Sequence, residues 1–394
     1  MKVSPGHYRE KSHCGYCGGD DSSRIYGFLA YELTVKEYQE LVDRGLRRSG
    51  VFVYKPDLAK SCCPQYTIRL RVEEFRPGKE HRQGLNRFNR FVGGAGNAHK
   101  KKKGKNNEYS LLTAIHEAEG EDFEVRLESS EFSQEKYELF RHYQMHVHNE
   151  TEDEVSEEQF RRFLCDNPFP RRDSSEPIEK NDGLRGHVHQ TYYHKGRLIA
   201  IGVLDVLPHC VSSVYFIWQQ DYARFGMGKI ASMQEIGLAL ELNKPYYYMG
   251  YYIHSCPKMK YKAQYRPSYI LEPRLAECDE ADGWWRPIED FESKLDESPY
   301  VTLVDKPTPD YGDHLKTDSK LFASAMPGLL PPSELQNVDP KDFVTLVVDD
   351  EDDEIPINMH LIRPQFRTQV KMAQLELIAI VGKDLAQNAR IKVG

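Results

Sequence analysis

The sequence predicts a mixed α/β (α+β) protein of two lobes, a metal-binding N-terminal lobe and a larger second lobe. Its 394 residues exceed the usual size of one domain. Four cysteines lie within residues 14–63, which indicates a metal site in the first lobe. The second half alternates strand-like and helix-like segments, as in a sheet covered by helices.

The lobe boundary is expected at a glycine- and lysine-rich stretch. Residues 93–108 hold four consecutive lysines among glycines and asparagines, a composition typical of flexible linkers. The sequence therefore predicts a Cys-rich metal-binding and substrate-recognition lobe at 1–92 and a flexible basic linker at 93–108. The second lobe is expected at 109–300, with a C-terminal extension at 301–394 that packs on the lobes.

Composition and charge indicate which classes of protein the sequence fits. Hydrophobic residues make up 39% and charged residues 29%, and no apolar run approaches the roughly 20 residues of a membrane helix. No apolar signal stretch follows Met1, so we expect a cytoplasmic protein, with the nucleus as a second compartment and no membrane partner. The net charge is −8, yet residues 69–105 carry twelve cationic and three acidic side chains. That block fits either an anion-binding site or a solvated linker.

The cysteine pattern predicts a metal site but leaves the metal open. Cys14 and Cys17 form a Cys-x-x-Cys knuckle followed by two glycines, and the adjacent pair Cys62 and Cys63 follows 45 residues later. Adjacent cysteines chelate one tetrahedral ion poorly, whereas an iron–sulfur cluster binds its thiolates through different iron atoms. Zinc would also fit if a histidine such as His13 replaced one of the pair.

Two elements of the first lobe are readable in detail. Residues 34–42 predict a helix in which Thr34 is the N-cap and Glu37 completes a capping box. Residues 65–72 alternate as a strand, and this alternation places Arg69 and Arg71 on the same face. Two neighbouring guanidiniums can bind a carboxylate or phosphate, although a solvent-facing strand surface is equally consistent with the pattern.

The second half predicts strands, a glycine loop, a helix, a strand and a short helix in that order. A hairpin is expected at 187–207, a strand at 212–218, a glycine-containing loop at 221–228 and a helix at 229–243. The stretch 246–267 begins as an aromatic strand and continues as a basic helix with interleaved tyrosines. Cations beside aromatic rings suit phosphates and nucleobases, and a solvated basic helix is the plainer interpretation.

Several separated motifs resemble the eukaryotic arginyl-tRNA–protein transferase (arginyltransferase) family over most of residues 10–290. They are Cys-Gly-Tyr-Cys at 14–17, Ser-Cys-Cys-Pro-Gln-Tyr-Thr-Ile-Arg at 61–69, Phe-Leu-Cys at 163–165, Ile-Ala-Ile-Gly-Val-Leu-Asp-Val-Leu-Pro at 199–208, Cys-Val-Ser-Ser-Val-Tyr at 210–215, and the stretch 246–267. The sequence departs from the family pattern at 219–222 and 226–228. In the helix after Arg69, which is lysine-rich in the family, the basic residues are more widely spaced here and more of them are arginine.

The resemblance implies an aminoacyltransferase whose second lobe is like the N-acetyltransferase (GNAT) fold. Such enzymes move arginine from Arg-tRNA to proteins that begin with Asp, Glu or oxidised Cys, which marks those proteins for the ubiquitin-ligase machinery. The resemblance also implies an iron–sulfur cluster or zinc at Cys14, Cys17, Cys62 and Cys63. A CoA-dependent N-acetyltransferase and a non-enzymatic, metal-containing RNA-binding module are the alternatives.

The reaction itself requires an amine to attack an activated ester, so a weak base and good positioning suffice. We expect Asp205 to accept the amine proton or to bind the arginyl guanidinium, with His189 as the alternative base and a capped strand end as the plainer role of Asp205. Tyr215 and Tyr248 are expected to position the ester or its oxyanion. The candidate substrate-binding residues are the cations and the histidine of two segments, namely Arg69, Arg71, His254, Lys258, Lys260 and Lys262.

Overall fold

The computed structural model describes residues 1–93, 109–170, 186–277, 283–336, 338, 344–348, 354–357, 361–387 and 389–393. The expected linker lies outside the described residues except for Gly93. The chain forms the predicted mixed α/β structure, built around two eight-stranded sheets. In the described ranges, no helix combines the length and apolar character needed to cross a membrane.

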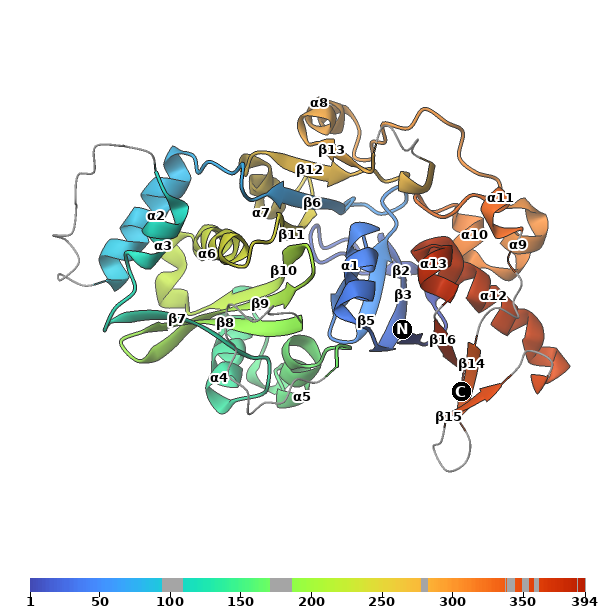
Figure 1. Cartoon of the computed structure of the whole chain (residues 1–394), viewed down its shortest axis with the longest axis horizontal. Coiled ribbons are helices and arrows are strands. Elements are labelled where there is room, and N and C mark those ends of the chain that lie inside the picture. The colour runs from blue at the N-terminus through green and yellow to red at the C-terminus, as the bar shows by residue number, and fades with distance from the viewer. Residues whose placement is uncertain are drawn as a thin grey trace.

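The first sheet combines both ends of the chain (Figure 1). Its order is β15 (Glu354–Ile357), β14 (Val344–Val348), β16 (Arg390–Val393), β1 (Lys2–Val3), β3 (Ser23–Glu32), β5 (Phe52–Pro56) and β4 (Arg47–Ser49), with β2 (His7–Ser12) paired to β3. Helices α1 (Val35–Asp43) and α12 (Pro364–Val381) contribute buried side chains to the same core. The expected C-terminal extension therefore supplies strands of this sheet as well as packing helices.

The second sheet contains the strands of the expected second lobe and one strand from the first 92 residues. Its order is β13 (Trp285–Pro287), β12 (Ser268–Leu271), β6 (Tyr66–Arg71), β11 (Tyr246–Tyr252), β10 (Cys210–Trp218), β9 (Arg197–Val206), β8 (Gly186–His194) and β7 (Phe123–Ser129). β6 pairs antiparallel with β11, and α2 (Lys79–Val92) packs on α6 (Met227–Glu241). Residues 66–92, which we expected in the N-terminal lobe, thus supply one strand of the second sheet and a helix packed on α6, because strand pairing is not visible in the local sequence.

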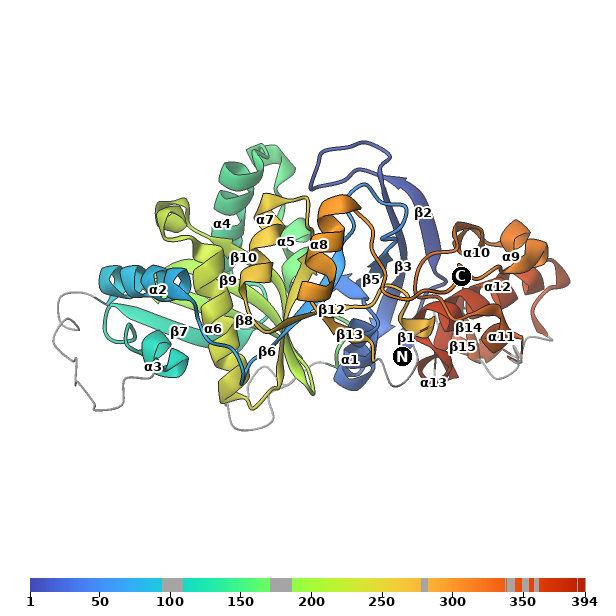
Figure 2. The same ribbon diagram turned by 90° about the horizontal axis from the view of Figure 1, so that it is seen from above.

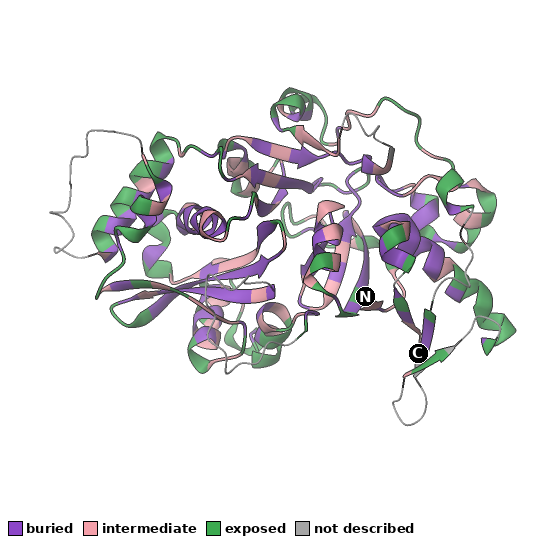
Figure 3. Ribbon diagram, viewed as in Figure 1, coloured by how far each residue is buried: buried purple, intermediate pink, exposed green. Residues whose placement is uncertain are grey.

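Helices cover both faces of the second sheet (Figures 1 and 2). α6, α2 and α3 (Leu111–His116) share one core with the sheet, while α4 (Gln134–Tyr143) and α5 (Glu157–Phe160) share another. α6 has buried positions around much of its circumference (Figure 3), since it lies between the sheet and other helices. The remaining helices are α7 (Pro257–Lys260), α8 (Glu289–Glu297), α9 (Gly312–Asp318), α10 (Lys320–Ser324), α11 (Pro332–Leu335) and α13 (Lys383–Gln387).

Short 3-10 and π segments join these elements. They are η2 (Gln144–His148), η3 (Glu152–Glu154), η4 (Arg161–Cys165), η5 (Gln220–Phe225), η6 (Tyr261–Gln264) and η7 (Leu275–Glu277). The predicted helix cap is confirmed, because the Thr34 side chain accepts from the Glu37 backbone N–H and Glu37 completes the capping box. The predicted hairpin is also confirmed, with Lys195 and Gly196 in the left-handed region at its turn.

Candidate functional site at the divergence of β10 and β11

The two central strands of the second sheet separate after a short parallel ladder. β10 and β11 pair in register from Cys210 with Tyr246 to Ser212 with Tyr248. Both strands then shift register with respect to their outer neighbours, and Gly250 adopts φ +70°. A Cβ at Gly250 would lie 3.9 Å from the Lys262 Nζ, so η6 places an amine beside the point of divergence.

A carboxyl group and an amine enter this region from opposite elements. Glu235 of α6 is 1% exposed, and its Oε2 accepts a 2.5 Å hydrogen bond from the Tyr247 hydroxyl. Burial raises the pKa of Glu235 to about 7. Lys262 is half-buried and donates to the Tyr251 carbonyl at 2.7 Å. Burial, followed by the charge of Arg47, lowers the pKa of Lys262 to about 7.

Asp205 forms a buried ion pair that joins the two sheets. Arg48 of β4 donates from Nε to Oδ2 at 2.9 Å and from Nη2 to Oδ1 at 2.5 Å, and both side chains are 0% exposed. His187 Nδ1 lies 3.1 Å from the same Oδ1. Burial alone would raise the pKa of Asp205, but Arg48 and His187 together hold it below its ordinary value. The carboxylate therefore binds a guanidinium of its own chain.

His189, the alternative base, also lies in the interior. It is 0% exposed, and its Nε2 lies 2.8 Å from the Leu164 carbonyl oxygen. Burial, followed by the charges of Lys136 and His187, lowers the pKa of His189 well below its ordinary value. Neither Asp205 nor His189 presents a surface to solvent here, and their direct roles in catalysis stay predictions.

Tyr248 and Arg69 lie in one connected group of side chains. The Tyr248 hydroxyl donates to Asp43 Oδ1 at 2.5 Å and accepts from Arg69 Nη1 at 3.3 Å. The Arg69 guanidinium stacks between the rings of Tyr246 and Trp285, 3.9 Å from each centroid. This stacking fixes the guanidinium, so Arg69 is a preorganised cation.

Tyr215 lies in a different core from Tyr248. Its ring packs 4.8 Å from that of Phe163, and its hydroxyl lies 3.1 Å from His148 Nε2. Burial raises the pKa of Tyr215 to about 12. The structure therefore does not bring the two predicted tyrosines to a common point.

The other predicted substrate-binding residues are closer to solvent. Arg71 is 42% exposed and donates to Glu74 at 2.6 Å. His254 Nε2 lies 2.7 Å from Asp296 Oδ1 and 3.1 Å from the Lys260 Nζ. Lys258 and Lys260 are exposed on α7, immediately before Lys262. Lys258 and Lys260 thus give α7 an exposed basic edge after the end of β11, whereas Arg71 pairs with Tyr246 at the start of that strand.

The four predicted metal ligands do come together. The sulfur atoms of Cys14, Cys17, Cys62 and Cys63 all lie within 4.8 Å of one another. Cys14 and Cys63 are buried against Ile253, which follows β11. A hydrogen bond from the Gly19 backbone, followed by those with the other thiols, lowers the pKa of Cys17 to about 7. Four convergent thiols, two of them buried, fit a metal that thiolates bind, so the residues present suit the predicted group.

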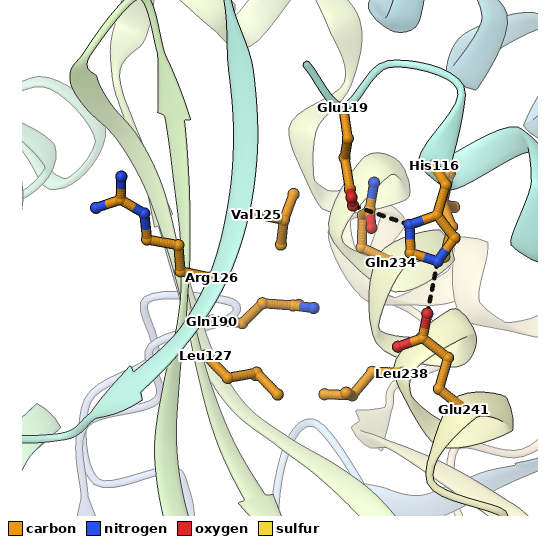
Figure 4. Close-up of a pocket in the computed structure, with 10 residues that line it drawn as sticks. His116, Glu119, Val125, Arg126, Leu127, Gln190, Gln234, Leu238 and Glu241 are labelled. Carbon is orange, nitrogen blue, oxygen red and sulfur yellow. Dashed lines mark hydrogen bonds and ion pairs between the residues drawn. The ribbon is translucent and has the colours of Figure 1, made fainter. Parts of the chain in front are cut away.

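A small cavity between α3, β7 and α6 is a poor substrate site (Figure 4). Its volume is about 20 Å³, close to that of one water molecule. His116 spans its edge, with Nδ1 3.0 Å from Glu119 Oε1 and Nε2 2.6 Å from Glu241 Oε1. This cavity is therefore part of the packing between α3 and α6.

The sequence analysis missed three side chains at the centre of this arrangement. Arg48 and His187 carried no local signal, because the partner of each, Asp205, lies on another strand. Glu235 did carry one, since an acidic residue interrupts an otherwise apolar stretch of α6. A charged residue in such a position is either paired with an opposite charge or has a shifted pKa, and here burial raises the pKa of Glu235.

Comparisons with known proteins agree over both parts of the chain. The family model "Arginine-tRNA-protein transferase, N terminus" matches residues 12–83, and "Arginine-tRNA-protein transferase, C terminus" matches residues 135–272. Together the two matches cover just over half of the 394 residues.

Curated relatives point the same way. Arginyl-tRNA–protein transferase 1 of Arabidopsis thaliana is 28% identical, with 75% of its length and 76% of this chain covered. The Saccharomyces cerevisiae protein of that name is 32% identical, with 59% of its length and 66% of this chain covered. An aspartate/glutamate leucyltransferase of Pseudomonas syringae pv. tomato is 28% identical over 92% of its length and 67% of this chain. A solved structure of L-PGS from Bacillus licheniformis aligns with 11% identity and a TM-score of 0.28, covering 48% of this chain and 47% of that one, which does not establish a shared fold.

Proposed function

The chain belongs to the arginine-tRNA-protein transferase family, and from this premise we propose that it transfers arginine from Arg-tRNA to the N-terminal α-amine of other proteins. The observation that carries the proposal is the match of both family models, in order, over regions that the fold brings together through the pairing of β6 with β11. The acceptors are proteins that begin with Asp, Glu or oxidised Cys.

The chemistry is aminolysis of an ester. The neutral amine attacks the arginyl carbonyl, a C–N bond forms, the C–O bond to the terminal ribose breaks, and the ribose oxygen gains a proton as the amine loses one. Lys262 accepts the amine proton, because an amine with a pKa of about 7 is substantially neutral at physiological pH. Its position beside the diverging strands, half-buried and next to the exposed cations of α7, supports this role.

In this proposal Asp205 is a positioning residue. Its pair with Arg48 holds β4 of the first sheet against β9 of the second, which aligns the surfaces of the two sheets around the substrates. Arg69, Arg71 and the basic edge of α7 bind the acidic acceptor side chain and the RNA. The order β8, β9, β10, α6, β11 with parallel β10 and β11 supports a GNAT-like second lobe.

We further propose one metal ion, zinc, at the four cysteines. Thiolates around a tetrahedral ion with bonds of about 2.3 Å lie about 3.8 Å apart. The observed limit of 4.8 Å fits this spacing and includes the adjacent pair Cys62 and Cys63, which the sequence alone suggested would chelate one ion poorly. A cluster holds its thiolates on several iron atoms and so spreads them farther. A bound zinc ion would cross-link the 14–17 knuckle to Cys62 and Cys63. It would thereby stabilise the small core in which Cys14 and Cys63 pack against Ile253. Metal analysis that finds iron and acid-labile sulfide instead of zinc would refute this assignment.

The proposal also includes the cellular context that the family implies. The arginylated products are substrates of the ubiquitin-ligase machinery, and the enzyme works in the cytoplasm and the nucleus. A tagged chain imaged in cells, together with the half-life of a reporter that begins with Asp, tests both statements.

The test of activity is a direct transfer assay. The purified protein is incubated with tRNA charged with labelled arginine and with two peptides that differ only in an N-terminal Asp or Ala. Label on the Asp peptide alone is the expected result. Failure to label it, with the metal site occupied and tRNA bound, would refute the transferase in favour of an RNA-binding module, and acetyl transfer from CoA would favour an acetyltransferase.

A further inference from the structure

The start of α6 lies beside a groove that none of the roles above uses. Two adjoining hollows of about 430 and 580 Å³ share Arg87, Arg224 and Phe225 as lining residues. Their walls come from α2, η5 and the first turn of α6. We refer to these joined hollows as the α2–α6 groove.

The α2–α6 groove is strongly cationic. Arg87, Arg90 and Arg224 are exposed, and Lys229 is half-buried. Among the lining residues the acidic group is Glu80, whose Oε2 lies 3.2 Å from the Lys229 Nζ. Three arginines are therefore left to bind an anion in a protein whose total charge is −8.

Aromatic rings accompany these cations. Phe91 is 42% exposed, which is unusual for a phenylalanine on a charged helix. The Arg224 guanidinium lies 4.9 Å from the Phe91 centroid and 5.0 Å from that of Phe225. A guanidinium next to an exposed ring is a surface on which an unpaired base can stack while its phosphate is bound.

Two further hydrogen-bond donors belong to residues that line the same groove. α6 begins after Gly226, which is exposed, adopts φ +70° and provides no side-chain cap for the first turn of the helix. His81 lines the groove, is 5% exposed, and its Nε2 has no hydrogen-bond partner within the described ranges. A buried ring nitrogen without a partner is costly unless a ligand or water satisfies it.

The groove also leads to the proposed reaction site. A Cβ at Gly228 would lie 3.5 Å from the Tyr261 hydroxyl, and Tyr261 directly precedes Lys262. Glu235 lies seven residues further along α6, about 10 Å by the rise of a helix. A ligand bound at the start of α6 is therefore within a few nucleotide lengths of the diverging strands.

We propose that the α2–α6 groove binds the sugar–phosphate backbone of the single-stranded 3′ end of the aminoacyl-tRNA, with one unpaired base stacked on Phe91. This assignment rests on the proposed function, since it identifies where that co-substrate enters. RNA suits the groove better than the pyrophosphate of CoA because the cations extend from Lys229 in one hollow to Arg90 in the other, where an exposed ring lies beside them.

The first test measures salt dependence. Arg87→Gln, Arg90→Gln and Arg224→Gln are combined in one variant, and tRNA affinity is measured from 50 to 200 mM salt. The slope of log K, where K is the association constant, against log salt is negative, and its magnitude should decrease by about 2 in the triple variant. The reason is that each of the three lost phosphate contacts to a single strand contributes about 0.7. Arg390→Gln, an exposed arginine on the first sheet, is the matched control and should leave the slope unchanged. An unchanged slope in the triple variant would overturn the assignment.

The second test isolates stacking. Phe91→Ala should weaken binding of intact tRNA by about fivefold or more. A tRNA that lacks its unpaired 3′ nucleotides should bind the wild type and Phe91→Ala equally. Equal weakening for both RNAs would overturn the stacking role, and competition by CoA at micromolar concentration would reassign the groove to that ligand.

The transfer assay separates failure of this inference from failure of the proposed function. If the groove alone is misassigned, the triple variant transfers arginine with an unchanged KM for Arg-tRNA. If the proposed function fails, the wild type transfers none. The expected result is a raised KM for Arg-tRNA in the triple variant, with an unchanged KM for the acceptor peptide.

Discussion

The Arg48–Asp205 pair offers the sharpest test of how the two sheets cooperate. In Asp205→Asn the Arg48 charge stays in an interior where both side chains are 0% exposed, and its carboxylate partner is gone. Breaking such a pair costs about 3–5 kcal/mol, and we expect about 3 because the amide oxygen still accepts a hydrogen bond. Such a loss exceeds a hundredfold change in the folding equilibrium.

A double-mutant cycle separates the pair from its two members. Arg48→Met combined with Asp205→Leu removes both charges, so it should cost clearly less than the sum of the two single changes. Glu124→Gln, which breaks the exposed pair with Arg126, is the control and should cost less than about 1 kcal/mol. Urea unfolding followed by fluorescence provides the free energies.

The same pair predicts a pH dependence with a definite sign. Because the folded-state pKa of Asp205 is depressed, its stabilisation is present above the unfolded value of about 3.9 and is lost as pH falls through the folded value. The stability gap between wild type and Asp205→Asn should therefore be constant near neutral pH and shrink below about pH 4. A coupling free energy near zero in the double-mutant cycle would refute the structural role of the Arg48–Asp205 pair. An Asp205→Asn protein that is as stable as wild type but has no transfer activity would also refute it, and would favour a direct role of Asp205 in catalysis.

Three further predictions concern the metal site and the substrates. Cys14→Ser should abolish stoichiometric metal binding measured by elemental analysis, whereas Cys165→Ser, outside the cluster, should retain it. Wild-type transfer should rise through about pH 7 as Lys262 loses its proton and again near pH 8 as the acceptor amine does. Lys262→Met should keep only the second rise, and a variant profile with both would contradict the assignment. Arg71→Glu should raise the KM for an Asp-initiated peptide much more than that for Arg-tRNA, and equal increases would argue against an acceptor-binding role.

Local chemistry in the chain was enough to predict that the four cysteines come together, as well as the helix cap and most elements of the second lobe. Cysteine spacing, the Thr34 capping box and the alternation of 65–72 act over a few residues, so each can be read without knowing the fold. The family motifs added the reaction, because the two family models that match these segments are those of arginine-tRNA-protein transferases.

The tertiary structure alone decided which partners these residues meet. β6 crosses from the expected N-terminal lobe into the second sheet, and the C-terminal strands join β1, because backbone pairing depends on distant segments. The same long-range contacts bury Asp205 against Arg48, 157 residues earlier, and leave Lys262 at the divergence of β10 and β11. Burial and charge pairing are properties of a three-dimensional neighbourhood, so the sequence could single out Asp205 and Lys262 as candidates, whereas only the fold showed how far each is buried and that Arg48 is the partner of Asp205.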